Sequence, residues 1–479
     1  MSKRILIISD SIYRQTGYST VTKNIIKNLD PSYTVAQLGL SHIPADYINN
    51  NQNIDYYSPI LKHKDCCNSN LTIEHFDCKT NNVEVITPDV NLTSSNDSDC
   101  QKGIPNSNDP YSFESAYYVI EHFKPDVVLA INDVWGMYKL NFLKNRSKFK
   151  FFAYLAVDSE CFPLSIQNKE TINTMQFVDT VDKLVVFTKW AKKTVNKSAK
   201  LSINKTFDNI EVIPHGVDLD KFSNLSNRDE IVSKLYNLDT KDVFIIGSVN
   251  RNQPRKRLDA IFQILQILKN KYEKKNGRKF MVHFHCAIQD SHGWNLPWLA
   301  RYYGVEDRVI LDQNLKPGLG VPDELLNLIM NSYDVHLVPT NSEGWGLSIL
   351  ETMACGIPNV ISDYSAHGDW AKDASLKIKL AAKIHEPITN HIKGIIDINH
   401  AAKQISLLYN SKQMIKDYTT KSLKLADKLQ WSNICVRWNE LFNGVEASTS
   451  YEEVNLLDIE NILPFPTDPL TTEFPVQEI

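Results

Sequence analysis

The sequence of 479 residues lacks several features that mark whole classes of protein. It has no run of about 18 or more apolar residues, so it predicts no transmembrane segment and leaves only peripheral contact with a membrane open. It has no excess of positive charge, because 52 Lys and Arg stand against 56 Asp and Glu, for a net charge of −4. We therefore expect no nucleic-acid partner.

The first residues do not have the pattern of a secretion signal. A short basic front is followed by a single apolar stretch, Ile5–Ile8, before Asp10. This stretch is too short for the core of a signal peptide and is typical of a first buried strand. We expect a cytoplasmic protein.

Cysteine is present, but it is not spaced for metal binding. Eight cysteines are scattered along the chain. Four of them fall in one stretch (Cys66, Cys67, Cys78 and Cys100), and they lack the paired Cys-x-x-Cys spacing of a zinc site. Without a secretion signal, the sequence predicts free thiols.

Short apolar runs alternate with helix-length segments through most of the chain, whose composition is 42% hydrophobic and 23% charged. The first series of strand-like runs comprises Ile5–Ile8, Val127–Ile131, Phe151–Val157, Leu184–Phe187 and Ile210–Ile213. The second comprises Val243–Val249, Val282–His285, Val309–Leu311, Val335–Val338 and Asn359–Ile361. Such alternation is typical of parallel sheets wound with helices. Two series of domain size predict the α/β class with two Rossmann-like domains facing each other across a cleft.

The predicted organisation has five parts. They are a first domain (1–223), a hinge (224–242), a second domain (243–430), a helix that crosses back to the first domain (431–444), and an acidic tail (445–479). Within the first domain, residues 49–110 are rich in Asn, Ser, Asp and Cys and predict a surface excursion, interrupted by a strand-like Val83–Ile86. The tail has eight acidic residues, four prolines and no Lys or Arg, so we expect it to be poorly ordered.

The most informative motif holds two glutamates, Glu343 and Glu351, in the order Glu-Gly-Trp-Gly-Leu-Ser-Ile-Leu-Glu. A strand-like run precedes it, and an apolar helical stripe follows and stops at Gly356-Ile-Pro358. Glu343 is therefore expected on a strand-to-helix loop, with Glu351 about two turns along the helix.

The residues between these glutamates suit an anion. Gly344 and Gly346 allow backbone N–H groups to approach a ligand, and Leu347 and Ser348 begin the helix, whose N-terminus favours negative charge. A carboxylate beside an anion site needs hydroxyl-rich partners. This combination suits a sugar nucleotide, with the diphosphate at the helix start, sugar hydroxyls on Glu343 and ribose hydroxyls on Glu351.

A basic loop opens the second predicted domain directly after a strand. Arg251 and Lys256 are placed at the carboxyl edge of a parallel sheet, where α/β proteins bind ligands. Arg251 can bind phosphate oxygens through two N–H groups, and Lys256 can add a point charge. Taken alone, the run fits a solvated basic loop or a nucleic-acid patch equally well.

Other strand ends offer weaker candidates. Gly17 lies between the first strand and a helix, where it suits close approach of a diphosphate or a simple turn. Asp158 follows another strand and is a candidate ligand-facing carboxylate. His215, His285 and His292 also lie near strand ends, and their pattern is more typical of structural histidines.

Together these residues make the chain resemble the retaining glycosyltransferases of family 4, which have the two-domain GT-B fold. Glu343 and Glu351 match that family's Glu-x7-Glu motif, with Trp345 in place of the usual Phe. Arg251 and Lys256 match its Arg and Lys five positions apart, although the next residue is Arg257 where many members have Gly. The looser matches are the glycine loop at Gly17 and the segment Ile213-Pro-His-Gly-Val-Asp218. The similarity runs from Lys3 to about Phe442, without residues 49–110.

The resemblance implies a retaining transfer of a sugar from a UDP- or GDP-linked donor to the hydroxyl of a carbohydrate, lipid or protein acceptor. It implies neither a metal nor another cofactor, and no Asp-x-Asp metal motif stands beside these sites. The departing phosphate can itself take the acceptor proton. The implied catalytic residues are Glu343, Asp158, Lys256 and Arg251. The implied donor-binding residues are Gly17, Arg251, Lys256, Glu343, Gly344, Gly346, Leu347, Ser348 and Glu351.

One departure from the family affects a single role. Many members have a His where this chain has Asp158, so Asp158 has two alternative partners, the donor sugar that the His would bond and the acceptor. Two other readings stay open. One is a different GT-B enzyme of sugar nucleotides, such as an epimerase or a glycogen-synthase-like polymerase. The other is a binding protein that keeps the cleft without turnover.

Overall fold

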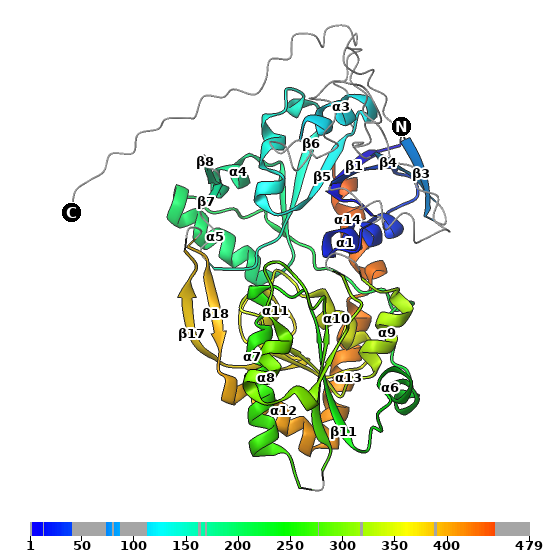
Figure 1. Cartoon of the computed structure of the whole chain (residues 1–479). Helices are drawn as coiled ribbons and strands as arrows, with labels where there is room; N and C mark the ends of the chain where they lie inside the picture. Colours follow the sequence, from blue (N-terminus) through cyan, green and yellow to red (C-terminus); the bar gives the residue numbers. More distant parts are fainter. Residues whose placement is uncertain are drawn as a thin grey trace, which may run out of the picture.

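The computed structural model describes residues 2–12, 14–40, 73–78, 81–86, 113–160, 164–167, 170–275, 277–316, 320–387 and 390–445. Most of the predicted excursion and almost all of the predicted acidic tail lie outside the described residues. Two parallel-sheet domains stack one above the other, which confirms the predicted fold class (Figure 1).

The first domain is built on a sheet in the order β10-β9-β6-β5-β1-β2-β4-β3. Its strands are β1 (Arg4–Asp10), β2 (Thr34–Leu40), β3 (Ile73–Cys78), β4 (Asn81–Ile86), β5 (Val127–Asn132), β6 (Lys150–Leu155), β9 (Lys183–Val186) and β10 (Glu211–Val212). All neighbouring pairs are parallel except the β3–β4 hairpin. This hairpin extends the edge of the sheet within the predicted excursion.

The helices of this domain are α1 (Gly17–Asn28), α3 (Phe113–Phe123), α4 (Thr174–Thr180) and α5 (Lys189–Ile203), and a small hairpin joins β7 (Leu164–Gln167) to β8 (Glu170–Asn173). Local signals explain where the helices begin and end. The Thr188 hydroxyl accepts the Ala191 N–H at the start of α5, and Asn204 ends the helix in the left-handed conformation.

The second domain has the sheet order β13-β12-β11-β14-β15-β16, and all its pairs are parallel. Its strands are β11 (Val243–Val249), β12 (Lys279–His285), β13 (Val309–Leu311), β14 (Val335–Val338), β15 (Asn359–Ser362) and β16 (Ser375–Ile378). Its helices are α6 (Arg228–Tyr236), α7 (Leu258–Ile267), α8 (Leu296–Tyr303), α9 (Asp323–Asn331), α10 (Leu347–Ala354), α11 (Ser365–Trp370), α12 (Ile398–Asn410) and α13 (Lys412–Lys428). A separate antiparallel pair, β17 (Leu380–His385) and β18 (Ile392–Ile396), follows β16.

Close packing fixes β11 at the centre of this sheet. Gly247 has no room for a side chain, because an added Cβ would lie 2.1 Å from the Tyr333 ring.

The predicted hinge segment contains α6, which buries Ile231 and Val232 and pairs Arg228 with Asp334 at 2.6 Å.

The last described helix, α14 (Trp431–Asn443), returns to the first domain and lies beside α1 and β1 in Figure 1. The Tyr33 hydroxyl donates to Asn443 Oδ1 at 2.7 Å, and the Lys3 ammonium donates to the Phe442 carbonyl at 2.6 Å. Trp438 is fully buried against Tyr154, with ring centroids 4.9 Å apart. The chain therefore crosses between the domains twice within its described part, before α6 and before α14.

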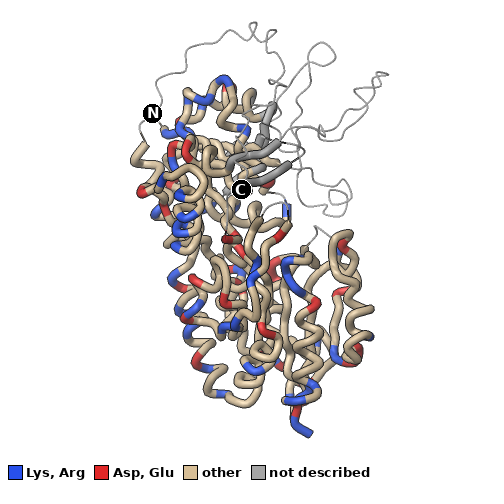
Figure 2. Tube along the Cα trace, turned by 90° about the vertical axis from the view of Figure 1, so that its left-hand side faces the viewer, with Lys and Arg blue, Asp and Glu red and all other residues tan. Residues whose placement is uncertain are grey.

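Charges of both signs are interspersed along both domains (Figure 2). No helix in the described ranges is long and apolar enough to cross a membrane. Three cysteines are described with their surroundings, Cys286, Cys355 and Cys435, and all three are buried free thiols, as the sequence predicts.

Candidate functional site at the interdomain cleft

Glu343 lies at the centre of the site, on the loop between β14 and α10. Its carboxylate bonds the Lys256 ammonium through Oε1 and accepts from Arg255 at 3.1 Å through Oε2. Burial alone would raise the pKa of Glu343, but the charges of Lys256 and Arg255 lower it to about 2. Glu343 is therefore an anion at neutral pH, and it contacts Lys256, which the sequence analysis assigns to the donor diphosphate.

The two cations come from one short turn after β11. Residues Pro254–Lys256 form a single 3-10 turn, and Arg257 adopts a left-handed conformation with φ of 53° before α7 begins. Burial lowers the pKa of Lys256 although Glu343 opposes this change. The Glu343 carboxylate raises the pKa of Arg255 above its already high value. Arg255 therefore remains charged at neutral pH, and the Glu343 carboxylate favours the charged form of Lys256.

Arg255 takes a place that the sequence analysis did not assign. It contacts Glu343 directly, whereas Arg251 lies 3.8 Å from Asp290, its one ion-pair partner among the described residues, and leaves 63% of its side chain exposed. The sequence signal for Arg255 was its position directly before Lys256 in a basic run. The run alone does not say which of its arginines contacts Glu343.

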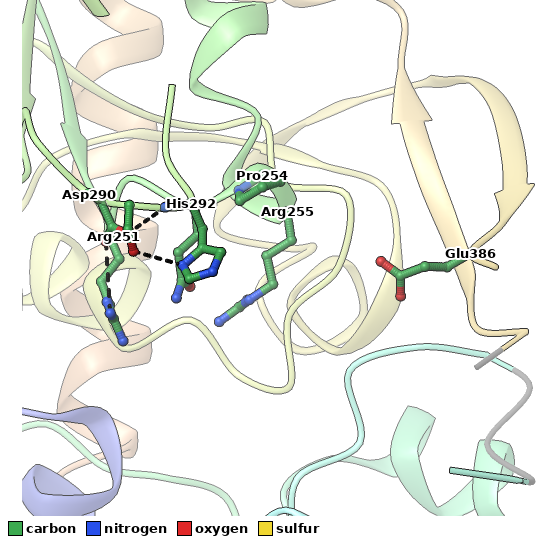
Figure 3. A pocket seen from close by; sticks show the side chains of 8 residues that line it. Arg251, Pro254, Arg255, Asp290, His292 and Glu386 are labelled. Atoms are coloured by element: carbon green, nitrogen blue, oxygen red, sulfur yellow. Dashed lines mark hydrogen bonds and ion pairs between the residues drawn. The ribbon is translucent and has the colours of Figure 1, made fainter. Parts of the chain in front are cut away.

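Arg251 and Arg255 instead share a cavity of about 590 Å³, with Gln253, Pro254, Asp290, Ser291, His292 and Glu386 as its other lining residues (Figure 3). In Figure 3 the Arg255 guanidinium lies between His292 on its left and Glu386 on its right. The cavity therefore holds the exposed guanidinium of Arg251 and the partly exposed guanidinium of Arg255, which also pairs with Glu343.

The loop after Glu343 brings the two domains close together. An added Cβ on Gly344 would lie 3.7 Å from Phe187 and 3.8 Å from Ala156, both at strand ends of the first domain. Gly346 has φ of 88°, which L-residues rarely adopt, and leads directly into α10. An added Cβ on Gly17 would lie 3.5 Å from Leu347, so the glycine at the start of α1 faces the start of α10 across the cleft.

Buried aromatic rings hold this loop in place. Trp345 is 4% exposed and stacks on Trp370 with ring centroids 4.4 Å apart, and Trp370 donates its indole N–H to the Trp345 carbonyl at 2.9 Å. The Glu343 N–H donates to the Ser365 hydroxyl at 2.9 Å. The carboxylate is thus presented by a fixed backbone.

Glu351 lies on α10 in a different environment from Glu343. Burial, together with the charge of Asp323, raises the pKa of Glu351 to about 7, although Lys221 opposes the rise. Within the described ranges, no side chain forms a hydrogen bond or ion pair with the Glu351 carboxyl group. The two glutamates of the motif therefore differ in both charge and partners, and they do not contact each other.

Carboxylates of the first domain face the cations across the cleft. Asp158, after β6, accepts from the hydroxyls of Ser159 at 2.7 Å and Ser342 at 3.3 Å. Burial opposes its ionisation, but Lys393 and Arg255 lower the pKa of Asp158 below its usual value. Ser342 belongs to the second domain and directly precedes Glu343. Its hydrogen bond to Asp158 therefore brings this first-domain carboxylate close to the Glu343 loop.

Asp133 is a second acidic residue at this edge, and the sequence analysis did not assign it. It follows β5, and burial with the charge of Asp158 raises its pKa to about 6 while a hydrogen bond from the Tyr18 hydroxyl opposes the rise. Its position after the strand-like run Val127–Ile131 is the same signal that identified Asp158. Lys393, which contacts Asp158 at 3.4 Å, carried no recognisable signal in the sequence.

Of the histidines near strand ends, His292 lines the cavity with Arg251 and Arg255, whereas His215 and His285 lie outside this arrangement of charges. His215 is buried among aromatic rings, bonds the Tyr154 hydroxyl at 2.8 Å, and has its pKa lowered to about 3 by burial. His283 and His285 both bond Asp312, at 2.9 and 2.5 Å. These three are the one group of potential metal ligands in the described part of the chain, and their ligand atoms already pair with one another.

Comparison with known proteins shows a family-model match for one region of the chain and similar solved structures for most of it. Residues 233–414 match the family model described as glycosyl transferases group 1, a region that covers less than half of the chain. It includes Arg251, Lys256, Glu343 and Glu351. No curated protein matches the chain.

Several solved structures share the whole architecture at low sequence identity. Sucrose-phosphate synthase from Thermosynechococcus elongatus superposes with a TM-score of 0.63 at 14% identity, covering 92% of this chain and 98% of that one. Anabaena HepE in complex with UDP and glucose gives 0.61 at 12%, covering 92% and 99%. WaaG, a glycosyltransferase involved in lipopolysaccharide biosynthesis, gives 0.57 at 13%, covering 92% and 100%. The chain thus has the GT-B fold of these proteins, and its second domain carries the sequence pattern of glycosyl transferases group 1.

Proposed function

We propose that this protein is a retaining glycosyltransferase that moves a sugar from a UDP- or GDP-linked donor to an acceptor hydroxyl. The observation that carries the proposal is the position of the Glu343 carboxylate. It lies between Lys256 and Arg255 at the interface of two Rossmann-like domains, while Glu351 lies about one turn into the helix that follows, α10, with no partner among the described residues. The match of this region to glycosyl transferases group 1 supports the same function.

The donor diphosphate would bind the cations of the loop after β11. Lys256 and Arg255 now neutralise Glu343, so an entering diphosphate would compete with that carboxylate for both of them. Arg251 has most of its side chain exposed and can turn toward the same phosphates. The N-terminus of α10, at Gly346 and Leu347, adds backbone N–H groups and a favourable dipole.

The sugar hydroxyls of the donor would then replace the cations on Glu343. Hydroxyl groups that donate to this carboxylate favour its charged form, as the two cations do in the free protein. Glu351 would accept the ribose hydroxyls, which supply the hydrogen bonds that its carboxyl group lacks among the described residues. Desolvation is what raises its pKa, and such partners would favour the ionised form.

In the transfer step, the bond between the anomeric carbon and the phosphate oxygen breaks, and the acceptor oxygen bonds the same face of that carbon. The acceptor proton passes to an oxygen of the departing phosphate, so no separate base is required. Lys256, Arg255 and Arg251 would stabilise the negative charge that develops on the leaving group, without a metal ion. Asp158 and Asp133 line the first-domain side of the cleft and would accept hydrogen bonds from the acceptor.

A panel of UDP- and GDP-sugars tests the proposal. A donor that binds the folded state raises the melting temperature by mass action, and slow hydrolysis of that donor without acceptor would reveal turnover. We expect one donor to do both. Stabilisation by a donor with no hydrolysis or transfer would favour the binding protein, and interconversion of the intact donor with its epimer would favour the epimerase. Stabilisation by no sugar nucleotide would overturn the proposal.

A further inference from the structure

The β17–β18 hairpin belongs to the second domain, yet it reaches the first. Figure 1 shows it extending from the lower domain toward α5 and the β7–β8 hairpin of the upper one. The Ile392 N–H donates to the Glu160 carbonyl at 3.1 Å, which forms an isolated antiparallel bridge between the domains. The Lys383 ammonium pairs with the Glu160 carboxylate at 2.5 Å. The hairpin therefore clasps the segment that follows β6.

Lys393, on β18, lies at the inner end of this clasp. Its ammonium donates to the Ser159 hydroxyl at 2.8 Å and to the Ser342 hydroxyl at 2.9 Å. Asp158 lies 3.4 Å away and Glu386 3.8 Å away. Only 7% of the Lys393 side chain is exposed. One buried charge thus has partners on both domains.

Separation of the domains would divide these partners. Asp158 and Ser159 would leave with the first domain, and Lys393 would keep Ser342 and the more distant Glu386. A buried ammonium without a close carboxylate is costly, so these contacts favour the closed arrangement. Ser342 directly precedes Glu343 in the loop after β14. Because the Lys393 ammonium bonds both Ser159 of the first domain and Ser342, it connects domain closure to the loop that carries Glu343.

We propose that Lys393 is a positioning residue that couples closure of the two domains to the placement of Glu343, with the β17–β18 hairpin as the clasp. The coupling to turnover rests on the proposed glycosyltransferase function, whereas the effect on closure does not. Lys393 touches neither the expected diphosphate cations nor Glu351. Its loss should therefore slow turnover while nucleotide binding by the second domain persists.

The test compares full-length Lys393→Met, which keeps the length of the side chain without its charge, with Lys393→Arg, which keeps the charge. Lys377→Met is the control, because Asp363, the partner of Lys377 among the described residues, lies 3.0 Å away on the same domain. Small-angle scattering gives the radius of gyration, calorimetry with UDP or GDP gives nucleotide affinity, and rates with the donor that the panel identifies give kcat and KM.

We expect Lys393→Met to have a larger radius of gyration than wild type and a kcat lower by about ten- to a hundredfold, the factor for one charge-assisted hydrogen bond. Its nucleotide Kd should stay within about threefold, and Lys393→Arg should recover most of both properties. Lys377→Met should match wild type. If Lys393→Met fails to melt cooperatively, Lys383→Met, at a half-exposed site, tests the same clasp and should open the domains to a smaller extent.

Each other result overturns the inference. A folded Lys393→Met with the radius of gyration of wild type would show that Lys393 does not hold the domains closed. An open variant with unchanged kcat would remove the coupling to Glu343. A wild type without turnover on any donor would refute the proposed function, and the scattering comparison would still decide whether the clasp exists.

Discussion

Replacing Glu351 with Gln should make the free protein more stable and at the same time weaken its binding of nucleotide. The structure raises the pKa of this carboxyl group from 4.5 to about 7. Between these values the folded state holds a proton that the unfolded state releases, so wild-type stability falls as pH rises through this window and levels off above it. Gln does not titrate, so the variant should gain on wild type over the same range.

The pKa shift of Glu351 sets the size of the stability effect, and the lost contact with ribose sets the size of the affinity effect. One pKa unit corresponds to about 1.4 kcal/mol, so the full cost of ionising Glu351 is about 3 kcal/mol. Partial exposure of this side chain to solvent reduces it, and we expect Glu351→Gln to be more stable by about 1–2 kcal/mol at pH 8 and equal to wild type near pH 4.5. Loss of a charge-assisted hydrogen bond from ribose should raise the Kd for UDP or GDP about ten- to a hundredfold at pH 8.

Denaturant unfolding and calorimetry at pH 6 and pH 8 measure the two effects. The affinity difference should shrink at pH 6, where the wild-type carboxyl is largely protonated. Phosphate titration acts equally on both proteins and cancels in the comparison. Glu440→Gln, on the exposed face of α14, is the control and should change neither quantity. An unchanged Kd for Glu351→Gln at pH 8, or an identical pH dependence in both proteins, would refute the role assigned to Glu351.

Three further predictions concern other parts of the chain. Lys256→Ala should lower kcat/KM about ten- to over a hundredfold, because it removes a charge-assisted contact with the leaving diphosphate, and wild-type turnover in steady-state assays would exclude that role. Glu343→Gln should bind UDP or GDP at least as tightly as wild type by calorimetry, since it frees Lys256 and Arg255, yet it should lose transfer; weaker nucleotide binding with proportionate loss of rate would contradict this. Truncation after Gly444 should shift the melting temperature by only a few degrees, as about 1 kcal/mol or less would in a large chain, and a larger loss in calorimetry would show that the tail docks on the fold.

Hydrophobic runs predicted the sheets well where strands are buried on both faces. Val243–Val249 coincides with β11, and Val335–Val338 with β14. Both strands are buried, so most positions in them are apolar and the run stands out in the sequence. Strands with mixed composition were missed, among them β2, whose sequence includes Gln37 and Gly39, and the β17–β18 hairpin, whose outer face is exposed.

The site was predictable in part, because strand-end loops in parallel sheets converge on one edge. Glu343 and Lys256 meet as this rule requires, and Gly17 faces Leu347 across the cleft. Arg255 contacts Glu343 from the 3-10 turn Pro254–Lys256, whereas Arg251 lies in the loop before that turn. Composition does not encode which of the two arginines makes this contact. Lys393 approaches Asp158 from 235 residues away through contact between domains, and local sequence patterns carry no information about such contacts.

The most direct test of the proposed function is the anomeric form of the sugar first released from the donor. Proton NMR can follow hydrolysis of the α-linked UDP- or GDP-sugar that best stabilises the protein, without acceptor and with EDTA present. The account predicts α-sugar and nucleoside diphosphate at the earliest times, with the rate strongly reduced in Lys256→Ala. Release of β-sugar would contradict retention, and the absence of cleavage in wild type, or equal cleavage in Lys256→Ala, would contradict the assignment of this cleft as a glycosyltransferase site.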